Sequence, residues 1–177
     1  ANKALVNKRM AESPLLEQWC RASLITDKYE VKDYALDRAE NGFHHALCFM
    51  MSRREMETYG LQLVEGRLWN DSVDESFTKN SFKAIINESA KKQFGITDIT
   101  RQKLQATEPH FASSSLPDFY NPPYEIVGVI KDFNVCHLAK SAMPVVIHFI
   151  DEQEHGLEYV TVSYRHKDRA QVTDYLR

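Results

Sequence analysis

The segment that decides the fold reads Tyr124-Glu125-Ile126-Val127-Gly128-Val129-Ile130-Lys131-Asp132-Phe133-Asn134, and it is apolar almost throughout before it turns abruptly polar. A short apolar run rich in β-branched residues that stops at turn-forming residues is typical of a buried strand. Within it, Gly128 permits close packing against a neighbour or a bend. We expect Asp132 and Asn134 to shape the turn after the strand. An acid–base pair of Lys131 and Asp132 is the weaker interpretation, since adjacent polar residues after a strand usually form a solvated turn.

The rest of the chain carries helix and strand patterns. Strands are predicted at residues 16–26, 29–36, 43–52, 84–86, 103–107, 144–150 and 157–165, and helices at 2–11, 53–59, 88–94 and 168–176. The first three strands follow one another through short connections, so we expect an antiparallel meander. Residues 96–123 have the weakest pattern. Together the patterns predict an α+β fold with a mostly antiparallel sheet.

Signals for helix ends are clear around two of these helices. Gly60 and Gly95 each follow a predicted helix, where glycine commonly forms the C-terminal cap. Asn87 precedes the helix at 88–94, and its side-chain oxygen can accept a hydrogen bond from an unpaired backbone N–H of the first turn. Glu88 in that turn suits the helix dipole. These residues predict a strand that leads directly into a capped helix.

Composition limits the function classes. The 177 residues are 43% hydrophobic and 27% charged, which predicts one folded domain, or one domain that carries a smaller inserted lobe. The formal net charge of −3 gives no basic excess for binding nucleic acid or anionic lipid. No apolar run approaches the roughly 20 residues that cross a bilayer as a helix. The chain starts at Ala1 and ends within a predicted helix, so we expect it to be a piece of a longer protein.

No metal or cofactor is predicted from the cysteines and histidines. Cys20, Cys48 and Cys136 are too few, and odd in number, for a disulfide scaffold. Cys20 and Cys48 lie in predicted strands, where two buried free thiols are favoured and a disulfide between them is the alternative. A zinc site of Cys48, Cys136 and one histidine is a further alternative. Ordinary surface or core histidines are favoured over it, because the chain has no Cys-x-x-Cys, His-Glu-x-x-His or His-x-His spacing. Adjacent residues such as His44 and His45 face opposite ways on a strand, so such a pair rarely gives two ligands to one metal.

No catalytic residue is predicted either. The chain has no Gly-x-Ser-x-Gly turn around a nucleophile and no glycine-rich phosphate loop, and its six glycines are dispersed. Carboxylates gather at Asp151, Glu152 and Glu154, in a predicted hairpin turn where exposure to solvent explains them. By elimination, a binding or mechanical role is favoured over catalysis.

Three motifs occur in order along the chain. Residues 59–67 contain a glycine turn and a Gly-Arg pair, residues 85–95 contain an Asn-Glu pair before a helix, and residues 126–133 are followed after a gap by Pro144. In this combination the sequence resembles the extracytoplasmic domain of MacB/FtsX-type ABC transporter permeases. It departs from that family after the second motif, where a Pro-x-Gly-Lys-like turn is usual and residues 96–123 are longer and polar instead.

The resemblance implies a domain between the first and second membrane helices of a four-helix permease, on the periplasmic side of the inner membrane. A porter-like α+β lobe is expected from residues 1–72 and 137–177, with a smaller, mostly β lobe from residues 73–136 inserted into it. The implied role is to couple ATP hydrolysis on a separate nucleotide-binding domain to a periplasmic adaptor or cargo protein, in efflux, lipoprotein release or control of a cell-wall hydrolase. A dimer is expected in the full transporter, whereas the domain alone is compatible with a monomer.

Aromatic residues in predicted loops are the candidate partner contacts: Trp69, Phe111, Phe119 and Tyr120. Exposed loop aromatics often anchor interfaces, although such side chains also cover the edges of cores. Two other functions stay open. A free-standing extracytoplasmic peptide- or sugar-binding module would have a signal peptide and no later membrane helices. A small hydrolase would need a pocket with convergent polar groups of perturbed pKa.

Overall fold

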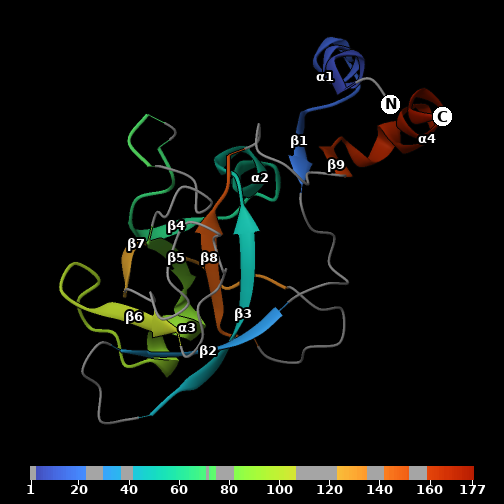
Figure 1. Ribbon diagram of the computed structural model, residues 1–177. Coiled ribbons are helices and arrows are strands. Elements are labelled where there is room, and N and C mark those ends of the chain that lie inside the picture. The colour runs from blue at the N-terminus through green and yellow to red at the C-terminus, as the bar shows by residue number, and fades with distance from the viewer. Residues whose placement is uncertain are drawn as a thin grey trace.

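The computed structural model describes residues 3–22, 30–36, 42–70, 72–74, 82–106, 123–134, 142–151 and 159–177. Its elements fall into two groups (Figure 1). The first, here called the terminal unit, comprises α1 (Lys3–Glu12), β1 (Gln18–Ala22), β9 (Tyr159–Ser163), a 3₁₀ turn (His166–Asp168) and α4 (Arg169–Leu176). The second, the sheet unit, comprises β2 (Glu30–Leu36), β3 (His44–Met51), α2 (Arg53–Thr58), β4 (Leu63–Gly66), β5 (Lys83–Asn87), α3 (Glu88–Gln93), β6 (Lys103–Ala106), β7 (Tyr124–Ile130) and β8 (Val145–Phe149).

The sheet unit is one seven-stranded sheet with two short helices. Its strand order is β4-β7-β5-β8-β3-β2-β6, and β6 also pairs with β7, so the sheet curls back on itself. Pairing is parallel for β3–β8 and β5–β7, and antiparallel for the other neighbours. The predicted α+β fold with a mostly antiparallel sheet is confirmed.

The predicted meander of the first three strands is wrong in its first member. β2 and β3 pair antiparallel, but β1 pairs with β9 in a separate two-stranded sheet, with Trp19 opposite Val162. Alternation of side chains identifies a half-buried strand without identifying its partner, which here lies near the other end of the chain. The four-residue strand β4 had no predicted counterpart either, because so short a segment carries little periodicity.

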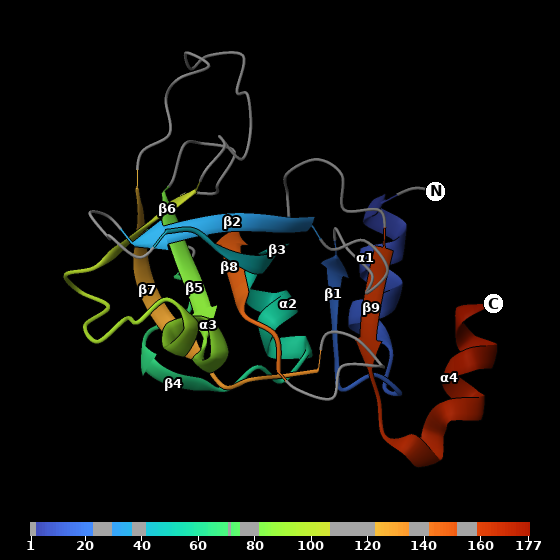
Figure 2. The ribbon, with the colours of Figure 1, turned by 90° about the horizontal axis from the view of Figure 1, so that it is seen from below.

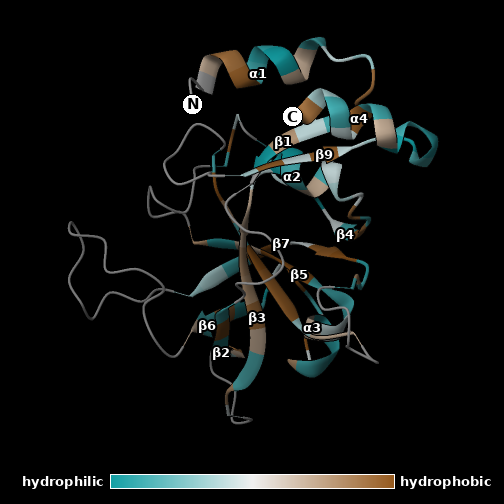
Figure 3. Ribbon diagram, turned by 90° about the vertical axis from the view of Figure 1, so that its right-hand side faces the viewer, coloured by the Kyte–Doolittle hydropathy of each residue, from teal (hydrophilic) through white to brown (hydrophobic). Residues whose placement is uncertain are grey.

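Both faces of the sheet are buried. Figure 3 shows hydrophobic residues along β5 and β7, and every residue of β8 is buried. On one face, Ile86 belongs to the same cluster as Phe94 at the end of α3. On the other face, Ile85 belongs to the same cluster as Met56 of α2. Adjacent strand residues point to opposite faces, so a strand buried on both sides reads as a continuous apolar run, as residues 126–130 do.

Strands from both predicted lobes lie in this sheet. β5, β6 and β7, from residues 73–136, pair with β8, β2 and β4, from residues 1–72 and 137–177. The division of the chain into those two lobes stays a prediction. The division that strand pairing shows directly lies between the terminal unit and the sheet unit.

The two ends of the chain lie at the same end of the molecule. In Figure 2, α1, α4 and the β1–β9 pair stand together, on the opposite side from β6 and β7. The Tyr175 hydroxyl on α4 donates a hydrogen bond to the Arg9 carbonyl on α1 at 2.6 Å, and the Arg9 guanidinium carbon lies 5.4 Å from the centroid of the Tyr175 ring. The terminal unit is therefore held by strand pairing and by contact between its helices. Among the described helices, none has the length and apolar character needed to span a membrane.

Candidate functional site

The three motifs that carry the family resemblance come together in space. The first motif contributes residues 63–66 to β4, the second contributes residues 85–87 to β5, and the third contributes residues 126–130 to β7. β7 lies between β4 and β5 in the sheet. Lys91 on α3 also forms an ion pair with Glu65 on β4, which ties the second motif to the first. The motifs thus form one structural unit.

β4 and β7 pair so closely at two opposed positions that only glycine fits there. Gly66 lies opposite Gly128 in the register, next to an irregularity in β4. A Cβ atom on Gly128 would lie 2.3 Å from the carbonyl oxygen of Arg67, and one on Gly66 would lie 2.3 Å from that of Val127. Gly66 also has a φ of +74°, which other residues rarely adopt. The predicted close packing at Gly128 is confirmed.

Asn87 joins β5, α3 and β8. Its Oδ1 accepts a hydrogen bond from the Ala90 backbone N–H at 2.9 Å, which confirms the predicted N-cap. The same oxygen accepts from the Val145 N–H at 2.8 Å. Its Nδ2 donates to the Met143 carbonyl at 2.7 Å. Asn87 is fully buried. Through these hydrogen bonds it caps α3 and also positions the start of β8.

Asp132 fastens the turn after β7 to α3. Its carboxylate accepts hydrogen bonds from the Ser89 backbone N–H at 2.9 Å and from the Ser89 hydroxyl at 2.7 Å. In return, the Asp132 backbone N–H donates to the Glu88 carboxylate at 3.4 Å. This is the turn-shaping role expected of Asp132. The polar side chains of the motifs therefore hold the strands and α3 together, and they explain the fold rather than a reaction.

Asp74 is the centre of a buried ion-pair cluster that no sequence pattern revealed. Its fully buried carboxylate accepts hydrogen bonds from Arg67 Nη2 at 2.8 Å and from Lys83 Nζ at 2.9 Å. The backbone N–H of Asn70 donates to it at 2.9 Å. Burial alone would raise the pKa of Asp74, but the hydrogen bonds from Arg67 and Lys83 outweigh it and hold that pKa well below its usual range. The cluster fixes the segment after β4 to β5.

Replacing Asp74 with alanine should lower the free energy of unfolding by about 2 kcal/mol, because three donors lose a buried acceptor. Arg67 and Lys83 keep part of their surface in water, which limits the loss. Since the folded pKa of Asp74 is depressed, its contribution is present at neutral pH and declines as pH falls below about 4. Urea denaturation at pH 7 and pH 3 checks this, and an equal deficit of Asp74→Ala at both values would contradict it.

The candidate contact residues are only partly described. Trp69 has 1% of its surface exposed, so the expectation of an exposed loop aromatic is wrong at this position. Its ring centroid lies 5.5 Å from that of Phe149 in the core. An indole buries a large apolar area, and the segment after β4 brings it back against the sheet. Phe111, Phe119 and Tyr120 lie outside the described residues, and their contact role stays a prediction.

Cys20 and Cys48 are buried free thiols, as the sequence favoured. They belong to different sheets, Cys20 to the β1–β9 pair and Cys48 to the sheet unit. Cys136 lies outside the described residues, so the structure does not test the zinc site of Cys48, Cys136 and one histidine. Within the part of the chain that the structure describes, no group of three or more histidine, cysteine, aspartate or glutamate side chains could hold a metal ion.

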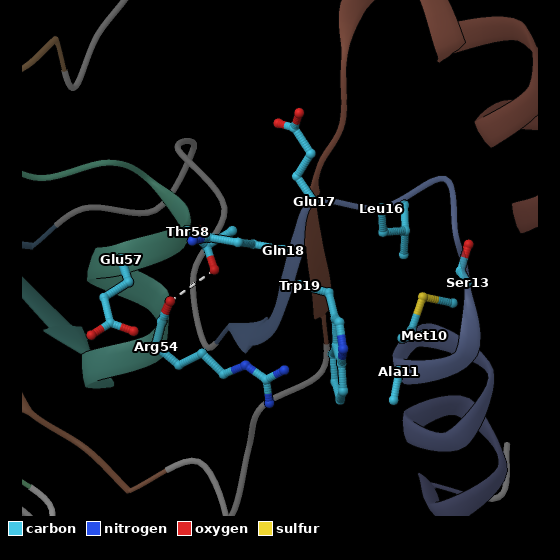
Figure 4. A pocket seen from close by; sticks show the side chains of 10 residues that line it. All are labelled: Met10, Ala11, Ser13, Leu16, Glu17, Gln18, Trp19, Arg54, Glu57 and Thr58. Atoms are coloured by element: carbon cyan, nitrogen blue, oxygen red, sulfur yellow. Dashed lines mark hydrogen bonds between the residues drawn. The ribbon is translucent and has the colours of Figure 1, made fainter.

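A cleft of about 410 Å³ opens where the terminal unit meets α2 of the sheet unit (Figure 4). Its walls are Met10, Ala11, Ser13, Leu16, Glu17, Gln18, Trp19, Arg54, Glu57 and Thr58. The Arg54 side chain extends from α2 toward Trp19 on β1, with its guanidinium carbon 4.2 Å from the ring centroid. At the end of α2, the Tyr59 hydroxyl lies 3.5 Å from Thr161 Oγ1 on β9. α2 thus contacts both strands of the terminal unit.

A cluster of side chains with perturbed pKa values lies inside the curled sheet, away from this cleft. Burial raises the pKa values of Tyr34, Cys48 and Tyr124, and it lowers the pKa of His148 to about 3. The Tyr34 hydroxyl lies 3.3 Å from His148 Nε2, and the Tyr124 and His148 ring centroids are 4.7 Å apart. All four residues are buried. The cluster is therefore part of the core and gives no support to a hydrolase.

The buried imidazole of His148 predicts an acid-sensitive fold. Its folded pKa is lower than its unfolded pKa of about 6.5, so the unfolded chain binds more protons as pH falls between the two values. The contribution of His148 to stability is present above its unfolded pKa of about 6.5. The free energy of unfolding should therefore drop by about 1.4 kcal/mol between pH 8 and pH 5.5 through this residue. Urea denaturation of wild type and His148→Gln across this range isolates the effect. A difference between the two proteins that does not change with pH would refute it.

The fold defines a class: the chain has the architecture of the extracytoplasmic domains of ABC transporter permeases. No family model and no curated protein matches the sequence itself. Among solved structures, the extracellular domain of the noncanonical ABC-type transporter YknZ from Gram-positive bacteria has a TM-score of 0.54 and 15% identity, over 97% of this chain and 76% of that one.

Two further structures agree. The periplasmic region of MacB from Actinobacillus actinomycetemcomitans has a TM-score of 0.56 and 12% identity, over 94% of this chain and 66% of that one. A domain of a protein assigned as a permease from Porphyromonas gingivalis has a TM-score of 0.57 and 16% identity, over 97% of this chain and 74% of that one. At these identities the likeness establishes the fold, and it confirms the resemblance that the three motifs indicated.

Proposed function

We propose that this chain is the extracytoplasmic domain of an ABC transporter permease, and that it couples ATP hydrolysis on a separate cytoplasmic nucleotide-binding domain to a periplasmic partner or cargo. The observation that carries the proposal is the pairing of α1 with α4 at one end of a fold shared with the extracellular domain of YknZ and the periplasmic region of MacB. In this proposal one membrane helix precedes α1 and three follow α4, in the inner membrane.

The terminal unit suits the transfer of a displacement. A membrane helix that moves α1 also moves α4, because Tyr175 joins the two helices, and both lead into the hydrogen-bonded β1–β9 pair. The sheet unit beyond it is packed on both faces. A close-packed core has low compressibility, so it passes a displacement on rather than absorbing it.

The partner is proposed to be a periplasmic adaptor or cargo protein, with efflux, lipoprotein release and control of a cell-wall hydrolase as the candidate processes. Phe111, Phe119 and Tyr120 are the proposed contacts with it. In the full transporter we expect two copies of the permease. The neighbours' own partners are no guide here, because the chain spans only 66% to 76% of the compared structures.

Membrane topology of the full-length protein tests this proposal. Alkaline phosphatase fused within this domain should be active, because that enzyme folds only outside the cytoplasm, while the same fusion after the last membrane helix should be inactive. The protein should also fractionate with the inner membrane. Phosphatase that is inactive within the domain would overturn the proposal. A protein secreted in soluble form would overturn it in favour of the free-standing peptide- or sugar-binding module.

A further inference from the structure

The two units of the fold meet at α2. Among the described elements, the principal contacts between the terminal unit and the sheet unit join α2 to β1 and to β9. The contacts lie near both ends of this short helix: Arg54 in its first turn stacks on Trp19 of β1, and Tyr59 at its C-terminal cap reaches Thr161 of β9. α2 therefore contacts both strands of the terminal pair.

α2 is itself anchored firmly in the sheet unit. It starts directly after β3, where the Ser52 hydroxyl oxygen accepts a hydrogen bond from the Glu55 backbone N–H at 3.0 Å. Met56 is fully buried in the same core cluster as Leu47 and Phe49 of β3. After the helix, the Leu61 N–H donates to the Met56 carbonyl at 3.0 Å. α2 and β3 should consequently move as one body.

The junction around these contacts is open and polar. The cleft of about 410 Å³ is lined by the end of α1, by the segment that leads into β1 and by α2, and charged side chains such as Glu17 and Glu57 are part of its walls. Two units move relative to each other by default unless their interface is large and hydrophobic. In this junction, Trp19 is largely buried, with 9% of its surface exposed. A guanidinium on the face of a largely buried indole is also a favourable contact in its own right.

We infer that α2 fixes the orientation of the terminal unit on the sheet unit, and that the stacking of Arg54 on Trp19 is the contact that decides it. Arg54 and Trp19 are thus positioning residues for transmission, and displacement of the β1–β9 pair enters the sheet through α2 and β3. The role of Arg54 and Trp19 in transmission rests on the proposed function. The fixed orientation itself is a property of the chain alone.

Residual dipolar couplings of the backbone amides in the 177-residue chain test the inference directly. In wild type, couplings from β1 and β9 should fit the same alignment tensor as couplings from β3, β5 and β8. In Arg54→Ala and in Trp19→Leu, the common tensor should be lost, with weaker alignment of the terminal unit. Arg53→Ala is the matched control, because it removes the Arg53–Glu57 ion pair from the same helix and leaves the stack in place. It should behave as wild type.

Unchanged amide chemical shifts in β3 and β8 will show that each variant is folded. Arg54→Ala and Trp19→Leu remove opposite partners of the same contact, so both should give the same result. A single tensor in Arg54→Ala would overturn the inference, as would two unrelated tensors in wild type. The outcome is independent of membrane topology. If the phosphatase fusions contradict the transporter proposal, the α2 attachment can still hold, and the reverse is equally true.

Discussion

Replacing Gly128 with alanine should lower the free energy of unfolding by about 3 kcal/mol or more, the range of severe overpacking in a core. The new Cβ would lie 2.3 Å from the Arg67 carbonyl oxygen and 3.2 Å from its carbonyl carbon. These are backbone atoms, which cannot rotate away as a side chain would. The β4–β7 pairing must therefore open. Urea denaturation at neutral pH measures the loss, and loss of the amide protection of Arg67 locates it.

Gly60→Ala is the matched control for this substitution. Gly60 has a φ of +67°, but the space that a Cβ would occupy there is open, so alanine adds backbone strain without a clash. A loss of about 1 kcal/mol is expected, as for a non-glycine residue in the left-handed region. If Gly128→Ala and Gly60→Ala destabilise the protein equally, close approach of β4 and β7 is not what Gly128 provides.

Replacing Asn87 with alanine should lower the free energy of unfolding by about 3 kcal/mol. Loss of the N-cap of α3 costs about 1 kcal/mol, and each buried group left without a partner adds about 1 kcal/mol or more. The groups in question are the Val145 N–H and the Met143 carbonyl. Hydrogen exchange should accelerate at Val145 as well as at Ala90, because one side chain serves both.

Asn87→Asp separates the capping role from the link to β8. Aspartate keeps the acceptor for Ala90 and Val145 but loses the donor to Met143 and places a negative charge against its carbonyl. It should fall between wild type and Asn87→Ala in stability. An alanine variant with exchange accelerated at Ala90 alone would show that Asn87 is only a helix cap.

Local chemistry in the sequence predicted local structure well. The cap at Asn87, the glycines after α2 and α3, and the buried strand at 124–130 each depend on residues within one or two turns of the chain. The family resemblance worked for a related reason. Its motifs contain residues whose backbone demands are specific, such as Gly66 and Gly128, which lie opposite each other where β4 and β7 pair.

What the sequence could not predict depends on residues far apart along the chain. The pairing of β1 with β9, the burial of Trp69 against Phe149 and the bonds from Asn87 to the start of β8 all join distant segments. The side chains themselves are ordinary in their local setting. Asp74 shows the limit most clearly, because an aspartate in a turn-like segment gives no sign that two cations and a backbone amide will surround it.

The coupling proposed for this domain is tested most directly by a distance in the full-length protein, assembled with the second copy and the nucleotide-binding domain that the proposed function requires. A spin label at Arg101→Cys, an exposed position in the turn before β6, reports the separation of the two sheet units. Cys20 and Cys48 are buried, and Cys136 is replaced by serine. We expect the distance distribution to shift between the nucleotide-free and ATP-bound states. An identical distribution in both states would contradict it.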